Sequence, residues 1–203
     1  MGRMTGIAAS LSAALLLGGC TIPLVATVAT IPGTLFEGLF YTFEGEEHSL
    51  PVSSSLALLS AQKAFARMAL PLDLIEPRKD GYLIDFRNGN LSGGIMLRSY
   101  ADRLTMIRTH VGGSSMRIAS IEASILEVIK YEALKSGYGE TFDATPYRIL
   151  YERPLEGASP VGWLLVDSML HSAKIGSRGW YAVRMPSGAI GFWRDEVHNP
   201  SRS

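Results

Sequence analysis

The single cysteine at position 20 constrains this chain more than any other feature. One thiol among 203 residues closes no internal disulfide and builds no thiolate zinc site on its own, so stability must come from apolar packing. Residues 7–17, directly before it, form an uncharged apolar stretch with Arg3 on its N-terminal side. That stretch is about half as long as the ~20 residues of a membrane-spanning helix. We therefore interpret residues 1–19 as a signal peptide that takes no part in the fold.

The four residues Leu17-Gly18-Gly19-Cys20 resemble the lipobox of bacterial lipoproteins. The resemblance implies cleavage before Cys20 and lipidation of its thiol, with acyl chains such as palmitate that anchor the mature chain. Thr21 stands where an Asp usually retains such lipoproteins in the inner membrane. The resemblance thus predicts a protein anchored to the periplasmic side of the outer membrane. The alternative is a secretory signal with an incidental cysteine.

The composition indicates a packed protein without a nucleic-acid partner. Hydrophobic residues make up 47% of the chain, which is enough for a core. Nineteen Lys and Arg balance nineteen Asp and Glu, so the basic excess expected of a nucleic-acid-binding protein is missing. Residues 20–40 are rich in Thr, Ala, Gly and Pro, and we interpret them as a tether. The tether either rests on the membrane or packs on the domain behind it.

Residues 41–136 have the pattern of an α+β domain. Turn signals and apolar periodicity predict a strand at 41–44, a helix at 53–69, strands at 72–76, 82–87, 94–99 and 103–111, and a helix at 115–135. In the second of the four consecutive strands, Tyr82, Ile84 and Phe86 face one way while Asp85 and Arg87 face the other. One buried and one wet face predict an antiparallel sheet with both helices on a single side.

This order of elements resembles a family of small bacterial lipoproteins of unknown function. The matching positions are Tyr41, Phe65 in the first helix, Asp80-Gly81, and Val111-Gly112 before Ile121 and Ile125. The resemblance implies an architecture and no activity.

After a linker at 137–145, residues 146–199 have an all-strand pattern. Gly179-Trp180-Tyr181, the turn Pro186-Ser187-Gly188 and Gly191-Phe192-Trp193 resemble the end of a bacterial SH3-like barrel. The resemblance implies a small C-terminal all-β barrel, with a long first loop at 153–160. A unit of this size buries too little surface to be stable alone, so we expect it to pack against the first domain.

Catalytic motifs are missing from the sequence, and we predict neither an enzyme nor a metal or cofactor site. There is no His-Glu-x-x-His, no Gly-x-Ser-x-Gly and no phosphate-binding Gly-x-x-x-x-Gly-Lys. The serines after Gly112-Gly113 are interpreted as a helix cap, with an anion site as the alternative. The remaining charged candidates fall into two groups. The first contains the single histidines His48, His110, His171 and His198, with the acid Glu46 near His48. The second is a candidate stripe of arginines on adjacent predicted strands, Arg98, Arg103 and Arg108.

Six aromatic residues of the C-terminal part are the candidate binding residues, because grooves of SH3-like barrels bind extended peptides on aromatic faces. They are Tyr147, Tyr151, Trp163, Trp180, Tyr181 and Trp193. Alternation along strands must bury about half of them, and we expect Trp180 and Trp193 to be partly structural.

These observations favour a non-enzymatic binding or scaffold lipoprotein that meets peptidoglycan or an envelope protein. The alternative is an accessory lipoprotein subunit of an envelope-spanning secretion or export complex. A cell-wall hydrolase is a third hypothesis, resting on isolated acids and histidines such as Glu46 and His48.

Overall fold

The computed structural model describes residues 47–112, 116–137, 139–168, 170–176 and 179–195. The predicted signal peptide, Cys20, the tether and the predicted strand at 41–44 lie outside these residues, as do Glu46 and His198. Neither helix in the described part of the chain is long and apolar enough to cross a bilayer.

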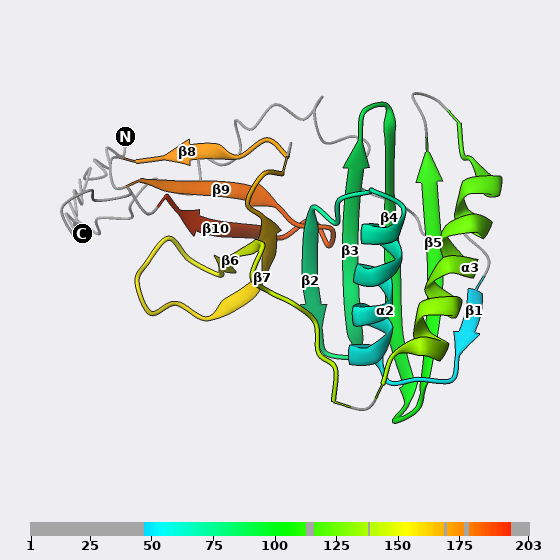
Figure 1. The fold of residues 1–203 in the computed structure, drawn as a ribbon. Helices are drawn as coiled ribbons and strands as arrows, with labels where there is room; N and C mark the ends of the chain where they lie inside the picture. Colours follow the sequence, from blue (N-terminus) through cyan, green and yellow to red (C-terminus); the bar gives the residue numbers. More distant parts are fainter. Residues whose placement is uncertain (1–46, 113–115, 138, 169, 177–178, 196–203) are drawn as a thin grey trace, which may run out of the picture.

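The described strands form one antiparallel sheet, and two helices pack together on part of it (Figure 1). The α+β class is therefore confirmed. The ten strands lie in the order β1-β5-β4-β3-β2-β7-β6-β10-β9-β8. In chain order the elements are β1 (Glu47–Leu50), α2 (Ser54–Arg67), β2 (Leu74–Arg78), β3 (Gly81–Asn88), β4 (Leu91–Ala101), β5 (Leu104–Gly112), α3 (Ala119–Lys135), β6 (Tyr147–Tyr151), β7 (Pro160–Leu165), β8 (Ala173–Ile175), β9 (Trp180–Arg184) and β10 (Ile190–Arg194).

Helix α2 forms where the spacing of apolar residues predicts it. The Ser53 hydroxyl accepts a hydrogen bond from the Leu56 N–H at 3.3 Å and caps the first turn. Leu58, Ala61 and Phe65 are buried along one face of the helix. The helix ends at Arg67 with Met68 as its C-cap. The next residue, Ala69, has a φ of 53°, the left-handed conformation that glycine usually takes after a helix.

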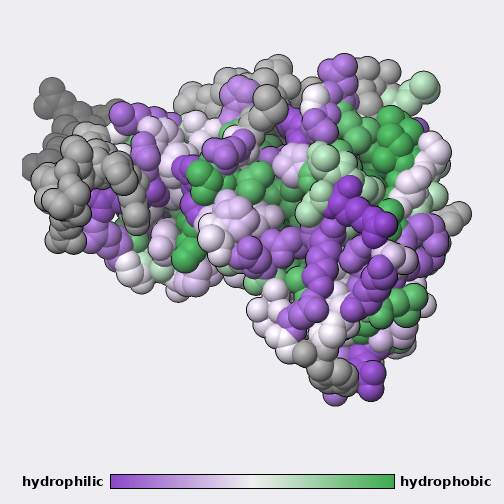
Figure 2. All heavy atoms as spheres, in the orientation of Figure 1, coloured by the Kyte–Doolittle hydropathy of each residue, from purple (hydrophilic) through white to green (hydrophobic). Residues whose placement is uncertain are grey.

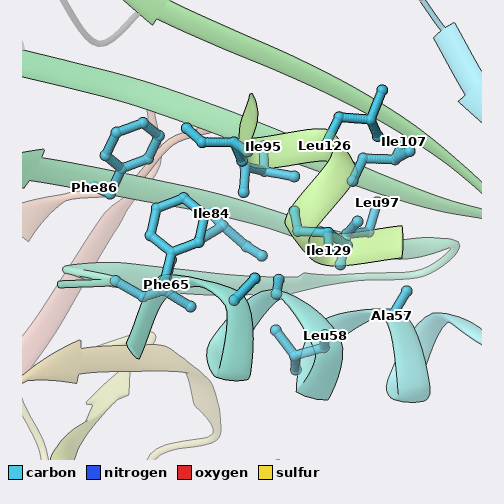
Figure 3. Close-up of a cluster of buried hydrophobic side chains, with 14 of the residues drawn as sticks. Ala57, Leu58, Phe65, Ile84, Phe86, Ile95, Leu97, Ile107, Leu126 and Ile129 are labelled. Atoms are coloured by element: carbon cyan, nitrogen blue, oxygen red, sulfur yellow. The ribbon is translucent and has the colours of Figure 1, made fainter. Parts of the chain in front are cut away.

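The main core lies between the helices and the face of β3, β4 and β5 that carries Ile84, Ile95 and Ile107. These three isoleucines have no exposed surface, and Phe65 and Ile129 point at them from α2 and α3 (Figure 3). Tyr82, Ile84 and Phe86 face this core as predicted, because alternate residues of a strand share a face. The prediction that both helices cover a single side of the sheet is confirmed.

Helix α3 begins at Ala119, later than the predicted start at 115, and its N-cap Ile118 offers no side-chain hydrogen bond. The predicted serine cap is therefore wrong for this helix. Backbone groups at the end of β5 explain the shift. The Val111 carbonyl accepts from the Ile118 N–H at 2.8 Å, and the Glu122 carboxylate accepts from the Val111 N–H at 2.9 Å. Arg117 thus forms an antiparallel bridge with Gly112 of β5 instead of a helical turn.

Strand β7 pairs with β2, so that β6–β10 continue the sheet of the first five strands. Gly162 makes the approach possible, because a Cβ there would lie 2.7 Å from the Ile75 carbonyl oxygen. Packing of the C-terminal part against the first part is thus confirmed. The expectation of a separate barrel is corrected to one shared sheet in the described residues.

The same junction corrects the prediction of a wet face at Asp85. Its side chain is only 2% exposed, although it points away from the helices. A second apolar cluster accounts for this burial, because Leu74, the neighbour of Asp85 across β2 and β3, packs there with Leu150, Leu164 and Met185. A strand pattern shows which residues share a face, but it does not show that a distant segment covers that face.

Candidate functional site

The hairpin of β9 and β10 positions the aromatic residues of the C-terminal strands. Its turn places the Met185 N–H 2.8 Å from the Ala189 carbonyl, and Gly188 takes the positive φ of 86° that such a turn needs. The register sets Tyr181 directly opposite Trp193. Gly191 allows β10 to pack closely on Met185, because a Cβ at this position would lie 3.1 Å from the Met185 sulfur. The predicted hairpin is confirmed.

Three side chains from three strands form a layered arrangement, which we call the Trp193 stack: Arg148, Trp193 and Tyr181. The rings of Tyr181 and Trp193 lie parallel with their centroids 4.3 Å apart, and the Arg148 guanidinium carbon lies 3.9 Å from the Trp193 centroid. All three side chains are half-buried. The stack combines a cation with two aromatic faces, a combination that suits carboxylate-bearing or planar ligand groups.

Hydrogen bonds hold the stack in place. The Trp193 indole N–H donates to the Ser172 hydroxyl at 3.2 Å, and an Arg148 terminal nitrogen donates to the Val166 carbonyl at 2.8 Å. The Arg148 Nε is buried and has no hydrogen-bond partner within the described residues. A guanidinium has five N–H donors, so Arg148 retains hydrogen-bonding capacity beyond its bond to the Val166 carbonyl.

A second pair of predicted residues, Tyr151 and Trp180, lies in a different cluster. Their rings meet edge to face with centroids 6.2 Å apart. Trp180 is 7% exposed and packs with Ile175 and Ala182, so it serves the core as expected. Tyr151 packs against this cluster and is half-buried.

Tyr147 and Trp163 lie in a third place, where the linker after α3 meets the main core. Phe142 of the linker contacts both rings, at centroid distances of 5.3 Å and 5.5 Å. Burial raises the pKa of the Tyr147 hydroxyl to about 12. The Gln62 side chain of α2 fixes the linker by bonding both the N–H and the carbonyl of Asp143, at 2.9 Å and 2.7 Å. The residue pair Tyr147 and Trp163 therefore joins the two halves of the protein.

An open pocket of about 460 Å³ lies beside this junction. Its walls are mostly apolar and come from α2, the chain after α2, the linker and β7, with Tyr147 among them. Lys63 at its rim forms an ion pair with Glu140 of the linker. The pocket offers no convergent set of polar groups, so we do not assign it a ligand.

The six predicted aromatics thus divide into three clusters and do not line one groove. No family model and no curated protein matches this chain. The choice among the clusters depends on their chemistry. Of the three, the Trp193 stack is the one that carries a cation and has both rings half-exposed. Sequence reasoning missed Arg148, although alternation places it on the same face of β6 as the buried Leu150.

Three carboxylates lie near the junction of β2 and β3: Asp73, Glu76 and Asp85, all nearly inaccessible. Burial raises the pKa of Asp85 to about 8, opposed by the nearby charge of Arg87 and reinforced by Asp73 and Glu76. Neither Asp85 oxygen has a hydrogen-bond partner in the described part of the chain. Glu76, in contrast, binds Arg78 and the Ser187 N–H, each at 2.9 Å. No group of three His, Cys, Asp or Glu among the described residues is arranged to hold a metal ion.

The other charged candidates are spread over the first half of the sheet. Arg98 and Arg103 are exposed, whereas the Arg108 Nε donates to a Glu47 carboxylate oxygen at 2.8 Å. His110 lies 4.0 Å from Glu122, which Arg117 also binds. His48 is half-buried on β1 opposite Ile107, and His171 is exposed between β7 and β8. The histidines described here therefore do not meet at one site.

Proposed function

We propose that this protein is a lipoprotein anchored through Cys20 to the periplasmic side of the outer membrane. In this proposal it acts as a non-enzymatic binding or scaffold module for peptidoglycan or an envelope protein. The anchor rests on the lipobox-like sequence before Thr21. The kinship to the small lipoprotein family of unknown function rests on the order of elements in the first half.

We interpret β6–β10 as the SH3-like part of the protein. The support is the sequence of the β9–β10 hairpin and the long connection between β6 and β7, which matches the predicted first loop. In this interpretation β2 takes the free edge of β7, which would tie the SH3-like part to the first domain.

The observation that carries the proposed function is the Trp193 stack. Aromatic faces attract the flat or apolar groups of a bound chain, and the guanidinium attracts its carboxylates. Stem peptides of peptidoglycan carry carboxylates on an extended backbone, as do acidic peptides of protein partners. An exposed apolar side chain lies beside the stack: Val166, whose carbonyl accepts the hydrogen bond from Arg148, is 49% exposed.

The test compares binding of the mature chain to purified sacculi and to envelope extracts. Tyr181→Ala and Arg148→Lys remove one ring face and the planar guanidinium, the latter with its charge kept. We expect each variant to bind at least about tenfold more weakly, or ~1.4 kcal/mol. Arg153→Lys is the matched control, because the Arg153 side chain is 68% exposed in the loop after β6 and should leave binding unchanged.

Unchanged binding of both stack variants would contradict this assignment of the site. Absence of binding to sacculi and extract proteins alike would contradict the proposed function itself. Co-purification with a stoichiometric envelope complex would instead favour the accessory subunit of a secretion or export machine.

A further inference from the structure

We infer that the segment before β1, residues 21–46, lies across the helix-free face of the sheet in the first half of the protein. This face consists of the side chains of β3, β4 and β5 that point away from α2 and α3. Its centre is apolar and half-buried, and cations surround it. The central residues are Leu83, Met96, Leu104 and Met106, and the surrounding cations are Arg87, Arg98 and Arg108.

The register brings these side chains together. Leu83 pairs with Met96 across β3 and β4, and Met96 pairs with Arg108 across β4 and β5. Their sequence neighbours Ile84, Ile95 and Ile107 are fully buried under the helices, so the side chains named above must lie on the opposite face.

Both described helices lie on the other side of the sheet, and the outer surface of the molecule on that side shows hydrophilic side chains between hydrophobic patches (Figure 2). On the helix-free face, the C-terminal strands bury Asp85 but leave Leu83 and Met96 half-exposed. Partly accessible apolar residues grouped on one sheet face are typical of an interaction surface.

The edge of the sheet directs the preceding chain toward this face. β1 pairs with β5 from Thr105 to Arg108. Further along β5, both backbone groups of Val111 are bonded to Ile118 and Glu122, and Gly112 forms a bridge with Arg117. The edge of β5 at Val111 and Gly112 is therefore already occupied. The beginning of α3 occupies the helix side at this point, whereas the described residues leave the helix-free side open.

The chemistry of the segment complements the face. Residues 21–46 contain three acids, Glu37, Glu44 and Glu46, and no Lys or Arg. They also contain large apolar side chains in the run from Leu35 to Phe43. On the face, Glu47 is paired with Arg108, and Arg87 lies near the Asp73 and Asp85 carboxyls. Arg98 is exposed and forms no ion pair with the described residues, so it leaves a positive charge for an acid to meet. Apolar side chains would cover the methionines while a glutamate meets Arg98.

The segment is also long enough. Its 26 residues span up to about 86 Å when extended, whereas the 11 residues of β4 span about 36 Å. If Cys20 is lipidated as proposed, docking of this segment holds the folded part close to the membrane instead of on a long tether. That consequence rests on the proposed function, but the docking itself does not.

Photo-crosslinking of the full chain in its own envelope tests the inference. With p-benzoylphenylalanine in place of Met96, we expect adducts within the same chain, in peptides from residues 21–46. The control position is Leu134, which is 83% exposed on α3 and should give no adducts with that segment. Adducts from Met96 to a second protein, a second copy or lipid, with none in residues 21–46, would overturn the inference.

A second measurement does not depend on the probe. Arg98→Glu places an acid where the segment would bring its glutamates, so cleavage at Glu37 by a glutamate-specific protease should become several-fold faster. Arg153→Glu changes an equally exposed arginine far from this face and should leave that rate unchanged. Equal rates in both variants, with unchanged thermal melting, would also overturn the inference. Neither measurement requires Cys20 to be lipidated, so the outcome is separate from that of the proposed function.

Discussion

Glu76 on β2 accepts a hydrogen bond of 2.9 Å from the backbone N–H of Ser187, which lies 111 residues further along the chain in the β9–β10 turn. Glu76 is 4% exposed, and Arg78 supplies its second partner. This contact connects the acidic junction of β2 and β3 with the hairpin that carries Tyr181 and Trp193. The two halves of the protein are therefore expected to unfold together.

Replacing Glu76 tests this connection. Glu76→Ala removes the charged acceptor of the part-buried bond from the Ser187 N–H, and we expect a loss of about 1–3 kcal/mol in the free energy of unfolding. Urea denaturation followed by circular dichroism measures it. Glu127→Ala is the control, since Glu127 pairs with Lys130 on an exposed helix surface and should cost less than about 0.5 kcal/mol. A loss as small as the control's would show that the contact does not stabilise the junction.

Asp85 should make stability depend on pH. Because its pKa is raised from 3.8 to about 8, the folded protein holds a proton that the unfolded chain releases above about pH 4. The contribution of Asp85 is complete below pH 4 and is lost as the pH rises to 8. Asp73, Glu76 and Arg87 are the charged groups around it. Asp85→Asn removes this titration and should stabilise the protein at pH 7 by an amount on the order of 1–3 kcal/mol.

Thermal melting between pH 4 and pH 8 checks this prediction. The exposed turn residue Asp102 provides the control variant, Asp102→Asn, which should melt like the parent at every pH. If the melting temperatures of Asp85→Asn and of the parent changed with pH by the same amount over this range, Asp85 would be ionised in the folded state, which would contradict the prediction.

Replacing Ala69 by glycine should stabilise the protein, whereas the same replacement of an alanine inside a helix destabilises it. Its φ of 53° disfavours any residue with a Cβ, so Ala69→Gly should raise the free energy of unfolding by about 0.5–1 kcal/mol. Ala123→Gly, at an exposed position inside α3, should lower it by about 1 kcal/mol. Chemical denaturation measures the change in the free energy of unfolding of both variants. If both variants were less stable than the parent, the left-handed conformation of Ala69 would be contradicted.

The contact of β2 with β7 depends on Gly162. In Gly162→Ala the new Cβ would meet the Ile75 carbonyl at 2.7 Å and the Met185 methyl at 3.0 Å, so the strands must separate. We expect a loss of about 1–3 kcal/mol and faster hydrogen exchange in β7. Gly137→Ala, whose Cβ would meet its first neighbour at 3.7 Å, should be nearly neutral. Equal stability of the two variants would indicate that β7 does not pack against β2 this closely.

The sequence predicts local elements well where local physics determines them. The Ser53 cap and the three-and-four spacing up to Phe65 determine α2, and the Pro186-Ser187-Gly188 turn determines the last hairpin. The start of α3 depends on hydrogen bonds of the Val111 backbone with the Ile118 N–H and the Glu122 carboxylate. Helix propensities of single residues do not predict these contacts.

The candidate site was less accessible to sequence reasoning. Clustering of aromatics in the C-terminal part is visible in the sequence, but their division into three clusters depends on strand order and on the pairing of β2 with β7. Burial of Asp85 depends on the same long-range contact. Arg148 shows no motif, because its role comes from lying over Trp193, a residue of another strand.

The proposed lipid anchor is the claim on which the localisation and the function both depend. Mass spectrometry of the mature protein purified from its own envelope tests it most directly. We expect a chain that begins at Cys20 and carries a diacylglyceryl group on that thiol. An unmodified thiol at residue 20, or a chain that still contains residues 1–19, would contradict it.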